Sequence, residues 1–282
     1  MKTVSENFNN IGKAFKSIAK IMVQSGPVSI KHRSPKGPLI ILANGPSLNA
    51  TISESLHILK GNDTMSVNFA PNTDVFFLIR PKYHVLADPL FFAEEKASNI
   101  VLLYEQLAKV DWDLTLLVPR KFVKRLPETL LQNTAIKVET FNFVGVEGPV
   151  FFENILMGRK VGMPRPRNVL IPALMCGIWL GYEEIYITGA DHSWMQTISV
   201  NDENHVVSVQ PHFYKDDHKE RQRIDSAYTH YRLHQIVESF AVAFRSYHHV
   251  ESFARNQGVR IFNSTPGSFI DAFIRKPLPV SL

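Results

Sequence analysis

The sequence predicts an α/β protein whose core is a doubly wound, mostly parallel sheet, with an amphipathic helix at its amino terminus and a lid region late in the chain. Two observations predict this class. Short apolar runs bounded by turn-forming residues alternate with stretches of helical spacing, as in successive strand and helix units. The first run, residues 38–43, is apolar without alternation, which is typical of a strand that helices cover on both faces.

Residues 1–36 are expected to form an amphipathic helix followed by a basic linker, and residues 37–282 the main domain. Apolar residues recur at helical spacing from Phe8 to Met22 with lysines among them, and Gly26-Pro27 ends the pattern. A helix with a basic polar face can lie in an anionic membrane interface. Packing on the body of the protein or on a second subunit, as a homo-oligomer, is the alternative, and the sequence leaves both open.

The first predicted strand ends in Asn44-Gly45-Pro46-Ser47, and ligands of open α/β sheets bind at such carboxyl ends. Gly45 permits a close backbone approach and Pro46 fixes its own φ, while Asn44 and Ser47 offer short polar side chains. Neither the dinucleotide fingerprint nor a Walker A loop is present. The segment predicts a nucleotide-binding loop, with an ordinary strand-to-helix turn as the alternative.

A capping-box spacing predicts a helix from Thr51 to about Gly61. Further strands are expected at residues 65–69, 83–87, 113–118, 135–139, 185–187 and 259–263, and further helices at residues 121–132, 168–181 and 226–257. The polar residues that follow these strands include Asn68, Asp88, Gly189 and Asp191. Several such ends in one sheet predict a shared ligand cleft. The polar segment at about 197–225 has the length of a lid.

The composition is that of a globular chain of 282 residues, with 45% hydrophobic and 20% charged residues. Its single cysteine, Cys176, excludes an internal disulfide and fits a reducing cytoplasm. We expect a cytoplasmic protein that could sit peripherally on the inner face of the membrane, since no apolar run approaches the roughly 20 residues of a span. The net charge of +5 favours anionic partners, and nucleic acid is disfavoured because basic runs interleaved with aromatic residues are absent.

Four motifs together resemble those of bacterial CMP-sialic-acid-dependent sialyltransferases. They are Asn-Gly-Pro-Ser-Leu at 44–48, Asn68 after the second strand, Asp-Pro-Leu-Phe-Phe at 88–92, and Leu-Gly-Tyr-x-Glu-Ile-Tyr-x-x-Gly-x-Asp at 180–191. Motility-associated factors, 6-hydroxymethylpterin diphosphokinase-like proteins and capsule or lipopolysaccharide proteins share them. The resemblance covers roughly residues 38–90 and 165–275. It implies a Rossmann-like sheet of the GT-A variant and a nucleotide-binding glycosyltransferase-like domain.

In the resembling family, the positions that match Asn44, Asn68 and Asp88 line the cytidine pocket. Asp88 replaces an asparagine of that family, and a carboxylate beside phosphates favours Mg²⁺. The resemblance implies the nucleotide-binding candidates Asn44, Gly45, Pro46, Ser47, Asn68, Asp88, Asn168, Gly189 and His192. The arginine that faces phosphate in the family aligns near Arg165 or Arg167, and with Lys215 these are our candidates for compensating the phosphate charge.

Transfer of a sugar needs a base for the acceptor hydroxyl, and histidine has a suitable pKa. In the resembling family the base lies on the lid, where His212 is our first candidate and His218 our second. Asp191 is expected to orient the loop or the acceptor, or to join Asp88 around Mg²⁺. No dedicated metal spacing is present, so no cofactor is expected to be obligatory, with Mg²⁺ as the one candidate.

The sequence thus predicts a glycosyltransferase of bacterial surface polysaccharide or glycoconjugate synthesis. It would move a sugar from a nucleotide donor, CMP-linked, to a glycan or lipid-linked acceptor. One alternative is a Mg²⁺-dependent 6-hydroxymethylpterin diphosphokinase-like enzyme that uses ATP. The other is a nucleotide-binding assembly protein without catalysis.

Overall fold

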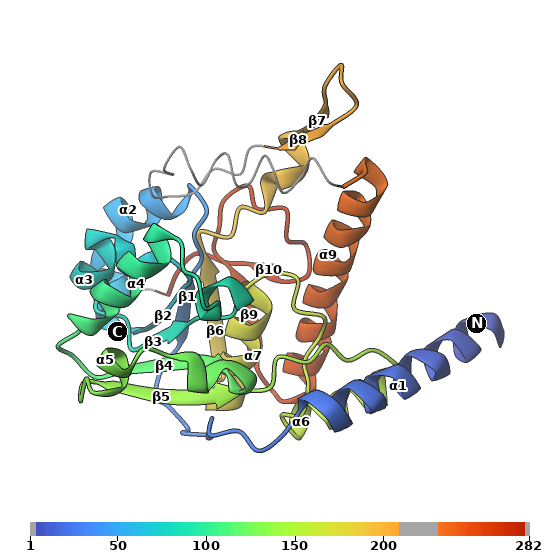
Figure 1. The fold of residues 1–282 in the computed structure, drawn as a ribbon, viewed down its shortest axis with the longest axis horizontal. Coiled ribbons are helices and arrows are strands. Elements are labelled where there is room, and N and C mark those ends of the chain that lie inside the picture. The colour runs from blue at the N-terminus through green and yellow to red at the C-terminus, as the bar shows by residue number, and fades with distance from the viewer. Residues whose placement is uncertain (1–3, 209–230, 280–282) are drawn as a thin grey trace.

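The computed structural model describes residues 4–208 and 231–279, and within them eight strands form one sheet (Figure 1). The order across the sheet is β10-β9-β6-β1-β2-β3-β4-β5. The strands are β1 (Leu39–Leu42), β2 (Asp63–Val67), β3 (Tyr83–Val85), β4 (Leu114–Pro119), β5 (Ile136–Phe141), β6 (Glu184–Thr188), β9 (Arg260–Asn263) and β10 (Ile274–Arg275). Each neighbouring pair runs parallel, so the fold class expected from the sequence is confirmed.

The strand order reverses between β1 and β6. The chain builds outward from β1 to β5 on one side, then returns to place β6, β9 and β10 on the other side of β1. Leu39 of β1 therefore pairs with Asp63 of β2 on one side and with Ile185 of β6 on the other. Such a switch point leaves a crevice at the carboxyl ends of the two central strands, because the connections that leave them diverge.

Helices cover both faces of the sheet. They are α2 (Leu48–Gly61), α3 (Asp74–Ile79), α4 (Ser98–Ala108), α5 (Glu128–Leu131), α6 (Val150–Gly158), α7 (Leu170–Leu180) and α9 (Leu233–Asn256), with 3₁₀ turns η1 (Ala70–Asn72), η2 (Pro89–Phe92), η3 (Arg120–Arg125) and η4 (Ser193–Gln196). Alternate residues of β1 point to opposite faces. Leu39 and Ile41 join the core under α7 and α9, whereas Ile40 and Leu42 join the core under α2. Every residue of α7 is buried, as expected of the apolar run at 168–181.

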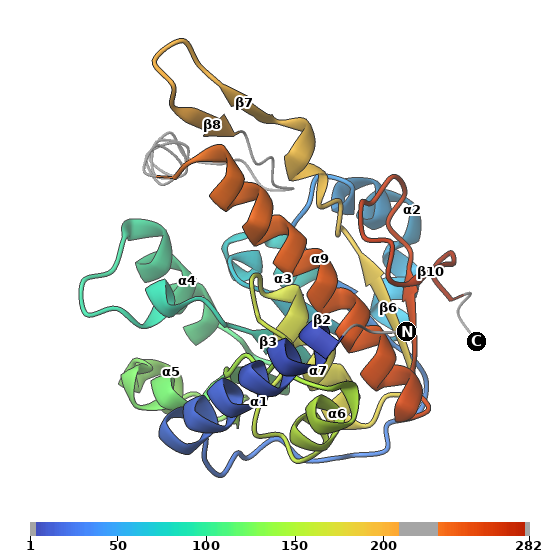
Figure 2. The ribbon, with the colours of Figure 1, turned by 90° about the vertical axis from the view of Figure 1, so that its right-hand side faces the viewer.

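The amino-terminal helix α1 (Val4–Gln24) lies along one side of the molecule and its first turns project beyond the body (Figures 1 and 2). The Ser17 hydroxyl donates to the carbonyl oxygen of Glu147 across 2.8 Å, which ties the helix to the segment before α6. Residues 27–37 form no helix or strand, and Arg33 within them pairs with the buried Glu139. None of the helices in the described ranges combines the length and apolarity that crossing a bilayer requires.

Several boundaries differ from the sequence prediction. Helix α2 begins at Leu48, not at Thr51, and it is kinked at Ser55. The helix expected over 121–132 is divided into η3 and α5, because Pro127 has no amide hydrogen to continue the first turn. The sequence analysis did not predict α3, α4, α6 or β10.

Part of the expected lid is a short antiparallel hairpin. Strands β7 (Ile198–Val200) and β8 (Val206–Ser208) are hydrogen-bonded to each other, with Ser199 opposite Val207. Figures 1 and 2 show the hairpin projecting from the body next to the start of α9. Residues 209–225 of the expected lid lie outside the described residues.

Candidate functional site

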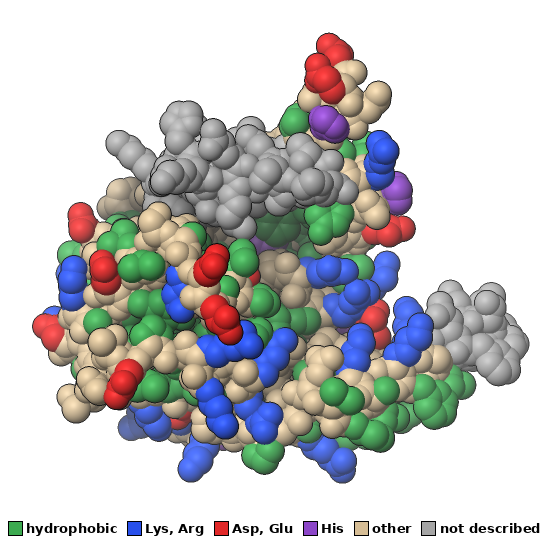
Figure 3. All heavy atoms as spheres, viewed as in Figure 1, with side chains coloured by type: hydrophobic (Ala, Val, Ile, Leu, Met, Phe, Trp, Pro, Cys, Tyr) green, Lys and Arg blue, Asp and Glu red, His purple; other side chains and the backbone are tan. Residues whose placement is uncertain are grey.

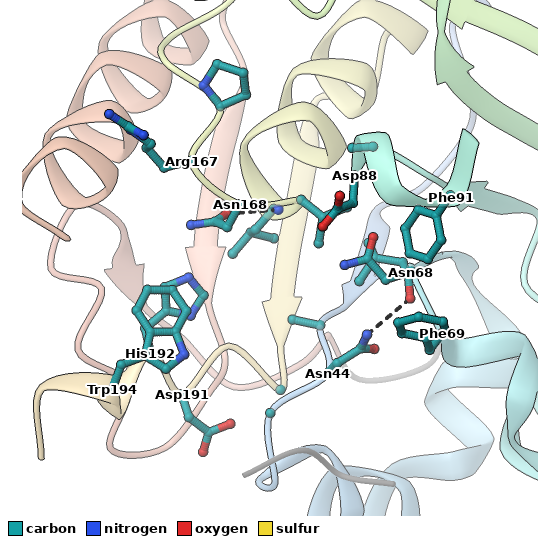
Figure 4. Close-up of a pocket in the computed structure, with 18 of the residues that line it drawn as sticks. Asn44, Asn68, Phe69, Asp88, Phe91, Arg167, Asn168, Asp191, His192 and Trp194 are labelled. Atoms are coloured by element: carbon teal, nitrogen blue, oxygen red, sulfur yellow. Dashed lines mark hydrogen bonds between the residues drawn. The ribbon is translucent and has the colours of Figure 1, made fainter. Parts of the chain in front are cut away.

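A cavity of about 570 Å³ opens at the carboxyl ends of the central strands, at the switch point of the sheet (Figure 4). Its walls come from the segments that follow four strands and from the segment before α7: residues 43–46, 67–69, 87–89, 166–170, Gly189 and 191–194, together with Phe91 and Phe143. The volume lies within the range of small-molecule sites, roughly 300–1,000 Å³. The four corners that the sequence singled out, at Asn44, Asn68, Asp88 and Asp191, all line this one cavity.

The floor of the cavity is formed where the loops after β1 and β6 are bonded to each other. The Ala43 amide donates to the Thr188 carbonyl across 2.9 Å, and the Gly45 amide donates to the Gly189 carbonyl across 2.7 Å. A Cβ atom on Gly45 would lie 2.6 Å from the Gly189 oxygen, and Gly189 itself has a φ of +69°. The close approach that Gly45 permits is therefore made to the protein's own backbone.

Three asparagine side chains around the cavity each carry a polar atom without a partner among the described residues. Asn44 donates through Nδ2 to the Val67 carbonyl, at 3.2 Å, and its Oδ1 is buried and unbonded. The Oδ1 of Asn68 and the Nδ2 of Asn168 are likewise buried without a bond. Leaving such an atom unpaired costs about 1–3 kcal/mol, so three around one cavity favour a ligand that bonds to them.

The amide of Asn168 is held in one orientation by the protein behind it. Its Oδ1 accepts from the Leu170 amide and from the Tyr247 hydroxyl, both at 3.0 Å, which leaves Nδ2 directed away from them. Because the Tyr247 proton is used in this bond, its oxygen accepts from Nε2 of His192, which lies 2.6 Å away. Burial lowers the pKa of His192 to about 3, so the ring is neutral near pH 7.

Two residues of the cavity wall have left-handed backbone conformations. Asn68 has a φ of 50° and His192 a φ of 53°, a region that non-glycine residues adopt at an energetic cost. Asn68 directly follows β2 and His192 lies in the loop after β6, and both residues line the cavity. Strain of this kind clusters at ligand sites.

The two carboxylates of the cavity differ in how they are bound. Asp191 accepts from the Ser47 hydroxyl across 2.8 Å and from the Ser47 amide at 3.4 Å, at the amino terminus of α2. That helix end thus already carries a negative charge that its dipole favours. Ser47 does not line the cavity. Asp88 is exposed, and one of its oxygens accepts from the Leu90 amide across 2.9 Å.

The cationic candidates are separated in space. Arg167 lines the cavity, whereas Arg165 lies 3.7 Å from Glu147 and is not among the lining residues. The candidates Lys215, His212 and His218 lie outside the described residues. Of the lining residues that the structure describes, Arg167 is the one with a side chain that is permanently positive.

Aromatic rings complete two facing walls, and the sequence analysis did not name them as site residues. In Figure 4, Phe69 and Phe91 lie on the wall of Asn44 and Asn68, while Trp194 lies on the wall of Asn168 and Arg167. Phe69 and Phe91 meet edge to face with 5.1 Å between ring centres, and the Trp194 ring lies 4.2 Å from the His192 ring. Their positions within three residues after Asn68, Asp88 and His192 in the sequence were the available signal.

No protein-family model matches the chain, and no curated protein matches it in sequence. Among solved structures, its fold is similar to that of the MAf glycosyltransferase from Magnetospirillum magneticum AMB-1, with a TM-score of 0.49 and 12% sequence identity. The similarity covers 96% of this chain and 38% of the length of that protein.

Proposed function

We propose that the chain is a glycosyltransferase that takes a sugar from a CMP-linked donor and passes it to a glycan or lipid-linked acceptor of a bacterial surface glycoconjugate. The observation that carries the proposal is the set of three unbonded amide atoms around one cavity, Oδ1 of Asn44, Oδ1 of Asn68 and Nδ2 of Asn168. Two acceptors and one donor on residues that line one cavity match the hydrogen-bonding groups of a nucleobase edge.

Cytosine satisfies this set better than uracil does. The cytosine amino group has two hydrogens, one for each of the acceptors on Asn44 and Asn68, and the carbonyl oxygen at C2 accepts from Asn168. Uracil has a single N–H on that edge, so one of the two acceptors would stay unpaired, at a cost of about 1–3 kcal/mol. Phe69 and Phe91 offer ring faces or edges against which a flat base packs.

In the proposed reaction the acceptor hydroxyl oxygen forms a bond to the anomeric carbon of the sugar. The bond from that carbon to the phosphate oxygen breaks, and CMP leaves with the electron pair. The guanidinium of Arg167 stabilises the charge that grows on the phosphate. The hydroxyl proton passes to a histidine of the lid, His212 in the first place and His218 in the second. Asp191 supports the site through its bond to Ser47.

A magnesium ion is an optional part of this proposal. Within residues 4–208 and 231–279, no group of three histidine, cysteine or acidic side chains is placed to hold a metal. Asp88 is exposed at the cavity with one oxygen not used by the Leu90 amide. Mg²⁺ is commonly bound by one or two carboxylates together with substrate phosphates, and Asp88 suits that arrangement.

The pair of carboxylates at the cavity favours one alternative, an ATP-dependent diphosphokinase-like enzyme. Asp88 and Asp191 would share Mg²⁺ with the phosphates of ATP, and an alcohol of the pterin class would accept the diphosphate. This enzyme requires Mg²⁺ and an adenine site. The two proposals therefore differ in which nucleotide binds and in whether the metal is needed.

A thermal-shift panel of CMP, CDP, UDP, GDP and ATP, each with and without Mg²⁺, tests both. We expect cytidine nucleotides to raise the melting temperature selectively, since a ligand at one hundred times its Kd stabilises the folded state by about 2.7 kcal/mol. Stabilisation by ATP alone, and only with Mg²⁺, would replace the first proposal by the second. A panel without any shift would overturn both.

The variant Asn168→Asp sharpens the test. It keeps an oxygen for the Leu170 amide and the Tyr247 hydroxyl but replaces the Nδ2 donor by an acceptor, so we expect the CMP shift to disappear. Asn201→Asp, on the exposed hairpin, is the matched control and should retain the shift. His212→Ala should keep CMP binding and lower transfer by about 10²–10⁴-fold, whereas unchanged transfer would remove His212 as the base.

A further inference from the structure

Helix α1 is attached to the body by one face and exposes an apolar face to solvent. The attached face consists of Asn10, Ala14, Ser17 and Ile21, spaced as residues that share one side of a helix. Ser17 is only 2% exposed and bonds to Glu147. The face of Ile11, Phe15 and Met22 is also regularly spaced, yet Phe15 is 68% and Met22 75% exposed. The helix thus keeps its most apolar face out of the core.

Helix α6 extends this exposed face. It lies beside α1, since a Cβ atom placed on Gly148, just before α6, would be 3.2 Å from the Cβ of Ala14. Phe151 at its start is 69% exposed, and Val150 and Ile155 are also exposed. We call the six side chains of both helices the apolar surface: Ile11, Phe15, Met22, Val150, Phe151 and Ile155. Figure 3 shows hydrophobic side chains gathered along this edge of the molecule.

Basic side chains border the apolar surface. Lys13, Lys16 and Lys20 lie on a further side of α1, with the spacing of one helix face. The acidic side chains of the segment before α6 and of α6 have partners within the protein, since Glu147 lies 3.7 Å from Arg165 and the buried Glu153 bonds to His249.

The turn η3 adds four exposed basic residues, Arg120, Lys121, Lys124 and Arg125. The linker that leaves α1 joins this turn to the helix, because a Cβ atom on Gly26 would meet the Arg120 guanidinium. Basic residues of α1 and η3 therefore lie on the sides of the apolar surface next to the polar face of α1 and the linker.

We propose that the apolar surface docks on an anionic lipid bilayer, with Phe15, Met22 and Phe151 among the acyl chains and the lysines near the headgroups. Helices that lie in a membrane interface combine an apolar face with a face rich in lysine and arginine, and α1 has both. A second copy of the chain fits less well, because a two-fold interface pairs the same surface of both subunits and would bring two positively bordered surfaces together. The inference is independent of the proposed sugar transfer.

Flotation of the full chain with vesicles tests the proposal. We expect it to float with phosphatidylcholine vesicles that contain phosphatidylglycerol, to float much less with phosphatidylcholine alone, and to be released as salt rises. The double variant Phe15→Ser, Met22→Ser should bind about tenfold or more weakly. The matched control Leu78→Ser, at an exposed leucine of α3, should bind as the unaltered chain does.

Charge-reversal variants measure the electrostatic contribution to vesicle binding. Lys16→Glu with Lys20→Glu should weaken binding to anionic vesicles about tenfold or more, whereas Lys60→Glu with Lys109→Glu, on α2 and after α4, should have little effect. Each variant is checked by its melting temperature, which should not change because the altered side chains are exposed. Absence of flotation, equal flotation of all variants, or a dimer that is lost in Phe15→Ser, Met22→Ser without vesicle binding would each overturn the proposal.

Discussion

Replacing Tyr247 by phenylalanine removes a single hydroxyl group from behind the cavity wall. The side chain is fully buried on α9, so no water takes the place of the lost group. The hydroxyl donates to Oδ1 of Asn168 and accepts from Nε2 of His192. Asn168 keeps its second bond, from the Leu170 amide, but His192 is left with a buried N–H that has lost its partner.

The structure gives the size of both effects. A buried donor without a partner costs about 1–3 kcal/mol, so we expect the free energy of unfolding to fall by about 2 kcal/mol. For a chain of this size that corresponds to a melting temperature lower by about 3 °C. The Asn168 amide, now held by one bond instead of two, should lose part of its bond to a ligand. One hydrogen bond contributes about 1 kcal/mol, so CMP should bind about fivefold more weakly.

Thermal unfolding followed by circular dichroism and CMP titration by calorimetry measure these quantities. The matched control is Tyr186→Phe, which removes a hydroxyl bonded to Glu184 on the opposite face of the sheet. Its CMP affinity should stay unchanged. An unaltered CMP affinity in Tyr247→Phe, with lowered stability, would refute the positioning of Asn168. An unaltered melting temperature would refute the hydrogen-bonded chain itself.

Three further predictions follow from burial and close contact. Burial lowers the pKa of His84 and of His192 to about 3 in the folded chain, against about 6.5 unfolded, so only the unfolded chain takes up these protons as pH falls below 6.5. Urea unfolding should show about 2 kcal/mol less stability per histidine at pH 5 than at pH 7.5, and a flat profile would contradict this. Gly45→Ala places a methyl group 2.6 Å from a backbone oxygen and should destabilise the fold by about 2–3 kcal/mol, whereas Gly61→Ala, in open space, should not. Burial raises the pKa of the Cys176 thiol, so a thiol reagent should label it only at the rate of unfolding, and fast labelling of the folded chain would refute its burial.

The corners of the cavity could be predicted from the sequence because they depend on local pattern. An unbroken apolar run such as residues 38–43 is a strand in a covered sheet, and the polar residue after it must then stand at the carboxyl edge. The same reasoning placed Asn68 and Asp88 correctly at that edge. Parallel strands bring these ends together without any further information.

The start of α2 could not be predicted in this way. The pattern from Thr51 to Glu54 has capping-box spacing, yet the helix begins at Leu48. Its first turn is bonded instead by the Asp191 carboxylate, which the chain supplies 144 residues later. A contact between segments so far apart leaves no trace in the local pattern of either one. Tyr247 was missed for the same reason, since it occupies a buried stripe position of a long helix.

Asp191 also determines where a phosphate can bind in this cavity. In many α/β proteins the helix after the first strand presents free amides to phosphate. Here the Asp191 carboxylate accepts from Ser47 at that helix end, so a second anion there would meet a like charge. A phosphate is favoured instead near Arg167, which stands beside Asn168 (Figure 4) and is the permanently positive side chain among the described lining residues. For the proposed nucleotide, this charge distribution favours a phosphate near Arg167 over one at the start of α2.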